Sequence, residues 1–192
     1  MRASDWVPPV AWMAVIIGLS TDTASSENTG RFLMPALRWI LPAATPPFLA
    51  ELHGILRKLA HVTEYAVLAA LWYRAFAAGR RRPPVAATLA VLVSVMWAAV
   101  DETFQTLTPS RTASPIDVAI DAVGALLASL VAGTGRSGPV DLAAGVLLWG
   151  ATIAGGAVLI FNAVVGAGSG AFWVTTAAAA LALVARHMAG EI

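Results

Sequence analysis

The stretch that decides the fold is residues 84–104, which read PVAATLAVLVSVMWAAVDETF. It carries no charged side chain before Asp101, and it is as long as the run of about 20 apolar residues that a membrane-spanning helix needs. The acidic pair Asp101 and Glu102 stands at its end. The stretch therefore predicts a spanning helix with a polar cluster at one of its ends.

Apolar stretches of the same kind lie on both sides of it. They cover about residues 6–20, 58–78, 116–132, 140–161 and 171–188. The first can also be interpreted as a cleaved signal peptide, but Asp5 stands where the basic n-region would be, and no clean Ala-x-Ala cleavage site follows. We therefore expect six transmembrane helices.

Composition agrees with a membrane protein. Charged residues make up 12% of the 192-residue chain, against about 25% in soluble domains. A soluble globular enzyme is thereby nearly excluded. The chain has no cysteine, which excludes a disulfide framework, a thiol nucleophile and a cysteine-ligated zinc site. The net charge of +1 gives no sign of a nucleic-acid partner.

The segment between the first two apolar stretches is more than a linker. Two short apolar pieces, residues 32–41 and 48–59, are separated by a break that begins and ends with Pro42 and Pro47. Each piece is too short to span a bilayer, so we expect short interfacial helices. The predicted fold is an all-α polytopic membrane protein, with a four-helix domain over residues 1–135 and two extra C-terminal transmembrane helices over residues 136–192.

Arginine placement predicts the orientation of the chain. Arg80, Arg81 and Arg82 form a cluster between the second and third predicted spans. Short loops rich in arginine face the cytoplasm. Both termini are then cytoplasmic in a multi-pass plasma-membrane protein, and the segments 21–57 and 105–115 face outward.

Polar residues gather in three of the predicted spans, at helical spacing. The second span opens with Lys58, His61, Glu64 and Tyr65, the third ends with Asp101, Glu102 and Gln105, and the fourth is preceded or opened by Arg111, Ser114, Asp117 and Asp121. In an alternating topology these groups meet at the outer face of the membrane. A charge inside a bilayer costs roughly 2.5–3.5 kcal/mol on insertion scales. The groups are therefore expected to face one another in a polar cavity that opens outward.

The ordered pattern from Lys58 to Asp121 resembles the VanZ-like family over roughly residues 6–132. The resemblance implies a small integral membrane protein with a four-helix core, and the family's namesake is associated with resistance to teicoplanin. It implies no established reaction. This chain departs from the family pattern at Phe104, Ser110 and Asp121, where His, Gly and Asn are more usual. Without a histidine at 104, a two-histidine metal site is not expected.

The residue types suggest roles in such a cavity. Lys58 and Arg111 can hold an anion. His61 can transfer a proton with Glu64 orienting it, and a carboxylate group can bind a divalent cation such as Mg²⁺ or polarise water. We assign that carboxylate role to Asp101, Glu102 and Asp117, and substrate contacts to Tyr65, Gln105, Ser114 and Asp121. Ser114, followed by proline, also has the pattern of a helix cap.

Four functional hypotheses follow. The leading one is a membrane-embedded hydrolase or transferase acting on a phosphate-bearing envelope lipid or lipid-linked cell-wall precursor. The second is a non-catalytic protein of glycopeptide resistance or envelope binding. The third is a small proton-coupled transporter, which the clustering of charges at one face disfavours. In the fourth, the charges only fasten the helices together.

Overall fold

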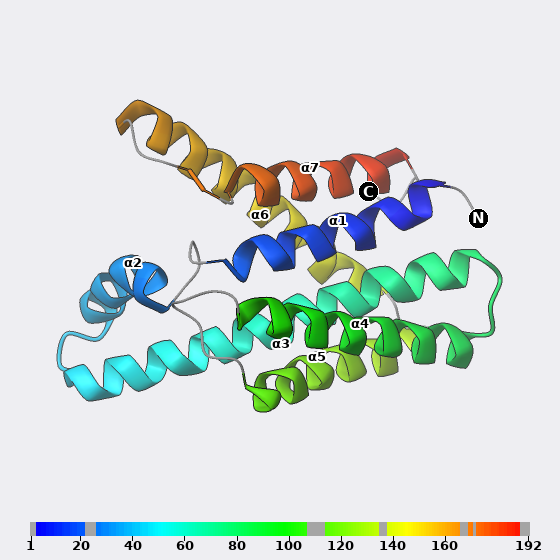
Figure 1. Cartoon of the computed structure of the whole chain (residues 1–192), viewed down its shortest axis with the longest axis horizontal. Coiled ribbons are helices and arrows are strands. Elements are labelled where there is room, and N and C mark those ends of the chain that lie inside the picture. The colour runs from blue at the N-terminus through cyan, green and yellow to red at the C-terminus, as the bar shows by residue number, and fades with distance from the viewer. Residues whose placement is uncertain are drawn as a thin grey trace.

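The computed structural model describes residues 3–21, 26–106, 114–134, 138–165, 169–170 and 172–188, and these form an all-α fold (Figure 1). The all-α part of the expected fold is thereby confirmed. The helices are α1 (Ala3–Leu19), α2 (Ser26–Ile40), α3 (Pro46–Ala78), α4 (Pro83–Gln105), α5 (Pro115–Gly133), α6 (Gly138–Val165) and α7 (Phe172–Met188).

Prolines and one serine determine where three of these helices begin. α3, α4 and α5 each start at a proline, a residue that suits the first helical position because its missing N–H has no intrahelical partner there. The side chain of Ser114 accepts a hydrogen bond from the backbone N–H of Ile116, 3.2 Å away. The cap predicted for Ser114 is confirmed.

The interfacial piece expected at residues 48–59 is not a separate helix. It forms the first turns of α3, which runs without interruption to Ala78. No proline stands between Pro47 and Ala78, so nothing breaks the backbone hydrogen bonding where the composition changes from polar to apolar. At 1.5 Å per residue α3 is about 50 Å long, longer than the roughly 30 Å hydrocarbon core. Its first turns therefore extend beyond the apolar segment 58–78.

The helices lie in layers around α3 (Figure 1). α3 packs against α4 and α5 on one side and against α1 on the other. α1 in turn packs along α7, and α6 lies against α7 and α3. Trp12, Ile16, Leu68 and Trp72 are buried in the core between these helices. The expected domain boundary at residue 135 stays a prediction, although α7 packs directly against α1.

Two of the described helices, α4 and α5, are long and apolar enough to cross a membrane by length and composition. α1 and part of α6 form shorter apolar helices, Asp5–Leu19 and Ala144–Ile153. On α4 and α5 large apolar side chains point away from the protein, among them Met96, which is 69% exposed, and Leu130, which is 66% exposed. A water-facing surface would not tolerate so many of them.

The two ends of the bundle differ. At one end lie the start of α1, the α3–α4 turn with its arginines and the end of α7; at the other lie the end of α1, all of α2, the end of α4 and the start of α5 (Figure 1). The second end holds the polar segments of α3, α4 and α5, as the alternating topology predicts. We call it the polar end.

Candidate functional site

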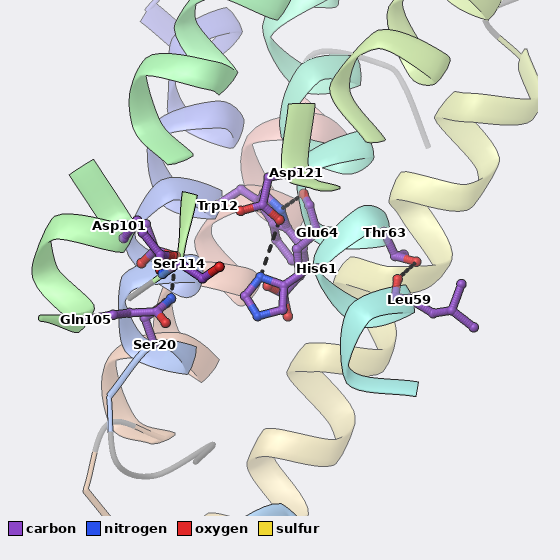
Figure 2. Close-up of polar contacts among 11 residues, drawn as sticks. Trp12, Ser20, Leu59, His61, Thr63, Glu64, Asp101, Gln105, Ser114 and Asp121 are labelled. Carbon is purple, nitrogen blue, oxygen red and sulfur yellow. Dashed lines mark hydrogen bonds and ion pairs between the residues drawn. The ribbon is translucent and has the colours of Figure 1, made fainter. Parts of the chain in front are cut away.

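A glycine lets α3 and α5 approach closely at the polar end. A Cβ atom on Gly124 would lie 2.2 Å from the backbone carbonyl oxygen of Val62, so only glycine fits at this crossing. His61 is the residue before Val62, and Asp121 lies about one helical turn before Gly124. The close crossing therefore brings these two side chains face to face. Their separation from His61 Nδ1 to Asp121 Oδ1 is 3.3 Å (Figure 2).

The His61–Asp121 pair has a defined geometry. Asp121 is 2% exposed, and the side chain of His61 is 19% exposed. A carboxylate facing Nδ1 favours the tautomer with the proton on that nitrogen, as in catalytic triads. Nε2 is then the nitrogen of His61 that remains to meet a ligand.

A second polar contact joins α4 to α1. The side-chain amide of Gln105 donates to Asp101 Oδ2 at 3.2 Å and to Ser20 Oγ at 3.4 Å (Figure 2). All three side chains are buried. Because buried polar groups are costly without partners, these bonds hold the end of α1 against the end of α4.

Glu102 has a structural contact of its own. Its Oε1 accepts a hydrogen bond from the backbone N–H of Ser114, which joins the end of α4 to the residue that caps α5. A carboxylate that accepts such a bond near a helix start is favourably placed relative to the helix dipole. This bond engages one of the two Glu102 oxygens in holding the polar end together.

The remaining predicted site residues lie near these pairs, and we call the whole group the network. Tyr65 is buried, near the carboxyl groups of Asp101, Asp121 and Glu64. The carboxyl group of Asp117 lies near enough to those of Glu102 and Asp121 to repel them when all are charged. The structure thus brings together the predicted site residues that it describes on α3, α4 and α5. The exception is Lys58 of α3, which is exposed.

A cavity of about 220 Å³ lies on one side of this network. Its walls come from the end of α1, from α2 and from α3: Leu19, Ser20, Thr29, Arg57, Ala60, His61 and Glu64. A water molecule needs about 10–15 Å³, so the cavity has room for a much larger group. We call it the polar cavity.

Comparison with known proteins supplies the family. A family model described as VanZ/LLP1 matches residues 6–135. The chain belongs to the VanZ/LLP1 family. The match takes in α1 to α5 and thus every helix of the network, whereas α6 and α7 lie beyond it. No curated protein and no solved structure matches the chain significantly. The VanZ/LLP1 match and the two apolar helices together indicate a membrane protein.

Among the described residues of the VanZ/LLP1 region, the cation that lines the polar cavity is Arg57. Lys58, the residue singled out in the sequence, is exposed and is not among the cavity walls. The lining residues of α3 are 57, 60, 61 and 64, which follow the i, i+3, i+4, i+7 pattern of one helical face. Lys58 also stands three residues before His61, so sequence spacing alone does not distinguish the two cations.

Thr29 and Ser20 also line the polar cavity, and the sequence offered no periodic signal for either. Thr29 belongs to α2, and its Oγ1 lies 3.2 Å from His53 Nε2 and accepts from Arg57 Nη1 at 3.4 Å. These contacts hold α2 over the cavity. The contact with Thr29 also gives a polar partner to His53, which is buried in the part of α3 that extends beyond the apolar segment.

The described residues fit paired side chains better than a metal centre. Among them, no three histidine, aspartate or glutamate side chains come together so as to hold a metal ion. The Mg²⁺ site considered from the sequence therefore has no support in this arrangement. Arg111, the other cation expected to bind an anion, lies outside the described residues.

Proposed function

We propose that this VanZ/LLP1 protein is a multi-pass plasma-membrane enzyme that acts on the phosphate-bearing headgroup of an envelope lipid or a lipid-linked cell-wall precursor. The observation that carries the proposal is the His61–Asp121 pair at 3.3 Å beside a cavity that Arg57 and Glu64 also line. A proton-transferring group and an anion-binding group at one cavity are the two parts that chemistry at a phosphate ester requires.

Arg57 supplies the anion-binding part. A guanidinium group is always charged and presents a planar fork that matches two phosphate oxygens. The guanidinium group of Arg57 interacts electrostatically with Glu64 and Asp117, which hold it near the cavity. A phosphate would exchange one of these partners for its own oxygens.

His61 supplies the proton-transferring part. Asp121 holds the imidazole through Nδ1, so Nε2 can take the proton of an attacking water or hydroxyl group. The P–O bond to the leaving group then breaks, and the same Nε2 returns the proton to the leaving oxygen. Glu64 lines the cavity one turn beyond His61 and can stabilise the imidazolium that forms between the two steps.

The orientation is part of the proposal. The arginines of the α3–α4 turn lie at the opposite end of the bundle from the polar cavity (Figure 1). If they face the cytoplasm, the cavity opens on the outer leaflet and both termini are cytoplasmic. Envelope lipids and lipid-linked precursors expose their phosphates at that surface.

Turnover tests the proposal. Purified protein in nanodiscs would be incubated with a radiolabelled polyprenyl phosphate and with a radiolabelled phosphatidate. We expect release or transfer of phosphate that His61→Ala and Asp121→Asn each reduce by a factor of about 10²–10⁴, the usual contribution of a general acid or base. His187→Ala, an exposed histidine on α7 far from the cavity, is the matched control and should retain activity.

Two other results would count against this assignment. Saturable binding of either lipid without turnover would point to a binding or resistance protein. Loss of folding in every variant of the network would point to a purely structural role for these charges. A comparison of Arg57→Ala with Lys58→Ala separates the two cations: we expect the first to raise KM strongly and the second to leave it nearly unchanged.

A further inference from the structure

A second, larger hollow lies beside the polar cavity. It has a volume of about 590 Å³ and runs between α1, α3 and α6. Its walls are mainly apolar, with Trp12 and Val15 from α1 and Leu147 and Ala151 from α6. We call it the apolar groove.

The two hollows adjoin one another. Leu19, Ala60 and Glu64 belong to the walls of both. At this junction the indole N–H of Trp12 donates to the backbone carbonyl of Glu64 at 2.9 Å, and Figure 2 shows Trp12 beside Glu64 and His61. The hydrogen bond joins α1 to α3 where the polar walls give way to apolar ones.

A glycine on α6 gives the groove part of its room. Gly150 lines the groove, and a Cβ atom built on it would meet nothing within 4 Å. Gly150 and Ala154 have the four-residue spacing of small residues that permits a close helix contact, but among the described residues no other helix approaches Gly150 closely. The close contact of α6 is made by Gly155, whose Cβ would lie 2.1 Å from Thr176 Oγ1 of α7.

We propose that the apolar groove binds the hydrocarbon chain of the lipid whose headgroup occupies the polar cavity. This rests on the function proposed above and names the ligand as a two-part amphiphile. An anionic headgroup would meet Arg57 and His61, and the first carbons of its tail would pass Leu19 and Ala60 into the groove. A free phosphate would leave the groove unused, whereas a lipid satisfies both hollows at once.

The proposal assigns a function to α6, which lies outside the VanZ/LLP1 match. α6 forms one wall of the groove through Val146, Leu147, Gly150, Ala151 and Gly155. In this chain the C-terminal helices thus supply part of the ligand site and do not only cover α1. Chain-length selectivity would then depend on residues of α6.

The test fills the groove from Gly150. Gly150→Leu places a side chain in open space, so it should occupy the groove without displacing protein atoms. Gly156→Leu is the matched control, since a Cβ there also meets nothing within 4 Å and Gly156 is not a groove residue. If Gly150→Leu fails to fold by size-exclusion chromatography, Val146→Trp, at the exposed rim of the groove, replaces it.

The probe is a phosphatidate with a diazirine near the end of its acyl chain, added to the full chain in nanodiscs. We expect cross-links to α6 in the wild type and in Gly156→Leu, and their loss in Gly150→Leu. Calorimetry with glycerol 3-phosphate, which has the headgroup but no tail, should give the same affinity for all three proteins.

The outcomes separate the two proposals. The groove assignment is overturned if Gly150→Leu cross-links as strongly as the wild type, or if all cross-links fall outside α1, α3 and α6. In either case, retained binding of glycerol 3-phosphate would still support the headgroup proposal. Cross-links lost in Gly150→Leu without any glycerol phosphate binding support the groove and count against the headgroup site. A dimer that Gly150→Leu disrupts, with no lipid cross-link in the wild type, shows that a second copy fills the groove and overturns the proposal.

Discussion

Replacing Gly124 with alanine is expected to force α3 and α5 apart at the point where the site is built. The new Cβ would lie 2.2 Å from the carbonyl oxygen of Val62, 2.9 Å from its carbonyl carbon and 3.1 Å from its Cα. All three are backbone atoms of a helix, so no side-chain rotation can relieve the contact. The two helices must separate.

The size of the effect follows from these distances. Real Cβ contacts are essentially never shorter than 3.0 Å, so the helices must part by about 0.8 Å, and overpacking of this kind costs about 1–3 kcal/mol. The same displacement would lengthen the 3.3 Å separation of His61 and Asp121 to about 4 Å and weaken their ion pair. Stability and the site geometry should therefore be lost together.

Thermal unfolding in nanodiscs measures the first effect. Gly54→Ala is the matched control, because Gly54 is exposed on α3 and its Cβ would meet nothing within 4 Å. Alanine is better than glycine in a helix by roughly 0.5–1 kcal/mol, so Gly54→Ala should raise the free energy of unfolding while Gly124→Ala lowers it. Equal changes in the two variants would refute the close helix approach on which the His61–Asp121 pair depends.

Three further predictions concern other parts of the chain. Glu102→Ala removes the acceptor for the Ser114 N–H and should lower the free energy of unfolding by about 1.5–3 kcal/mol. Glu102→Gln keeps an oxygen at the same place and should lower the free energy of unfolding less. Denaturant titration measures both changes. Burial, and to a smaller extent the positive charge of Arg57, lowers the pKa of His53 from its ordinary value. Neutral His53 therefore stabilises the folded state, fully so above about pH 6.5. We expect the docking of α2 on α3 to weaken as the pH falls through the lowered pKa of the folded state. A nitroxide on a cysteine at Trp39 would report that loosening, and no change with pH, or the same change in His53→Gln, would contradict it. Because the chain has no native cysteine, a single Arg81→Cys can be probed with an impermeant maleimide in intact cells, and labelling from outside would reverse the proposed orientation.

Much of the fold was accessible from local pattern. The limits of α4 and α5 are within one residue of the predicted spans, because apolar length and proline starts are both local signals. The break expected within residues 48–78 was wrong, since a change of composition does not end a helix when no proline or capping residue interrupts its backbone. The three-way meeting of polar segments was predicted correctly, because alternation of spans determines which ends share a face.

Within the polar end, sequence spacing predicted partners less well than helices. His61 and Asp121 were both candidates, but their pairing depends on how closely α3 approaches α5, which Gly124 alone permits. Arg57 and Lys58 are adjacent and both cationic, and only the rotation of α3 against α1 and α2 turns Arg57 toward the cavity and leaves Lys58 exposed. A rotation of about 100° per residue separates these two outcomes.

Composition and periodicity thus determined that this chain is helical and apolar, and that its few charges gather at one end. These properties depend on each segment's own hydrogen bonding and hydration, which the neighbouring residues specify. Packing decided which charges face each other, which cation lines the polar cavity and that α6 closes an apolar groove beside it. Those relations join residues far apart in the chain, so they exist only after the helices have packed against one another.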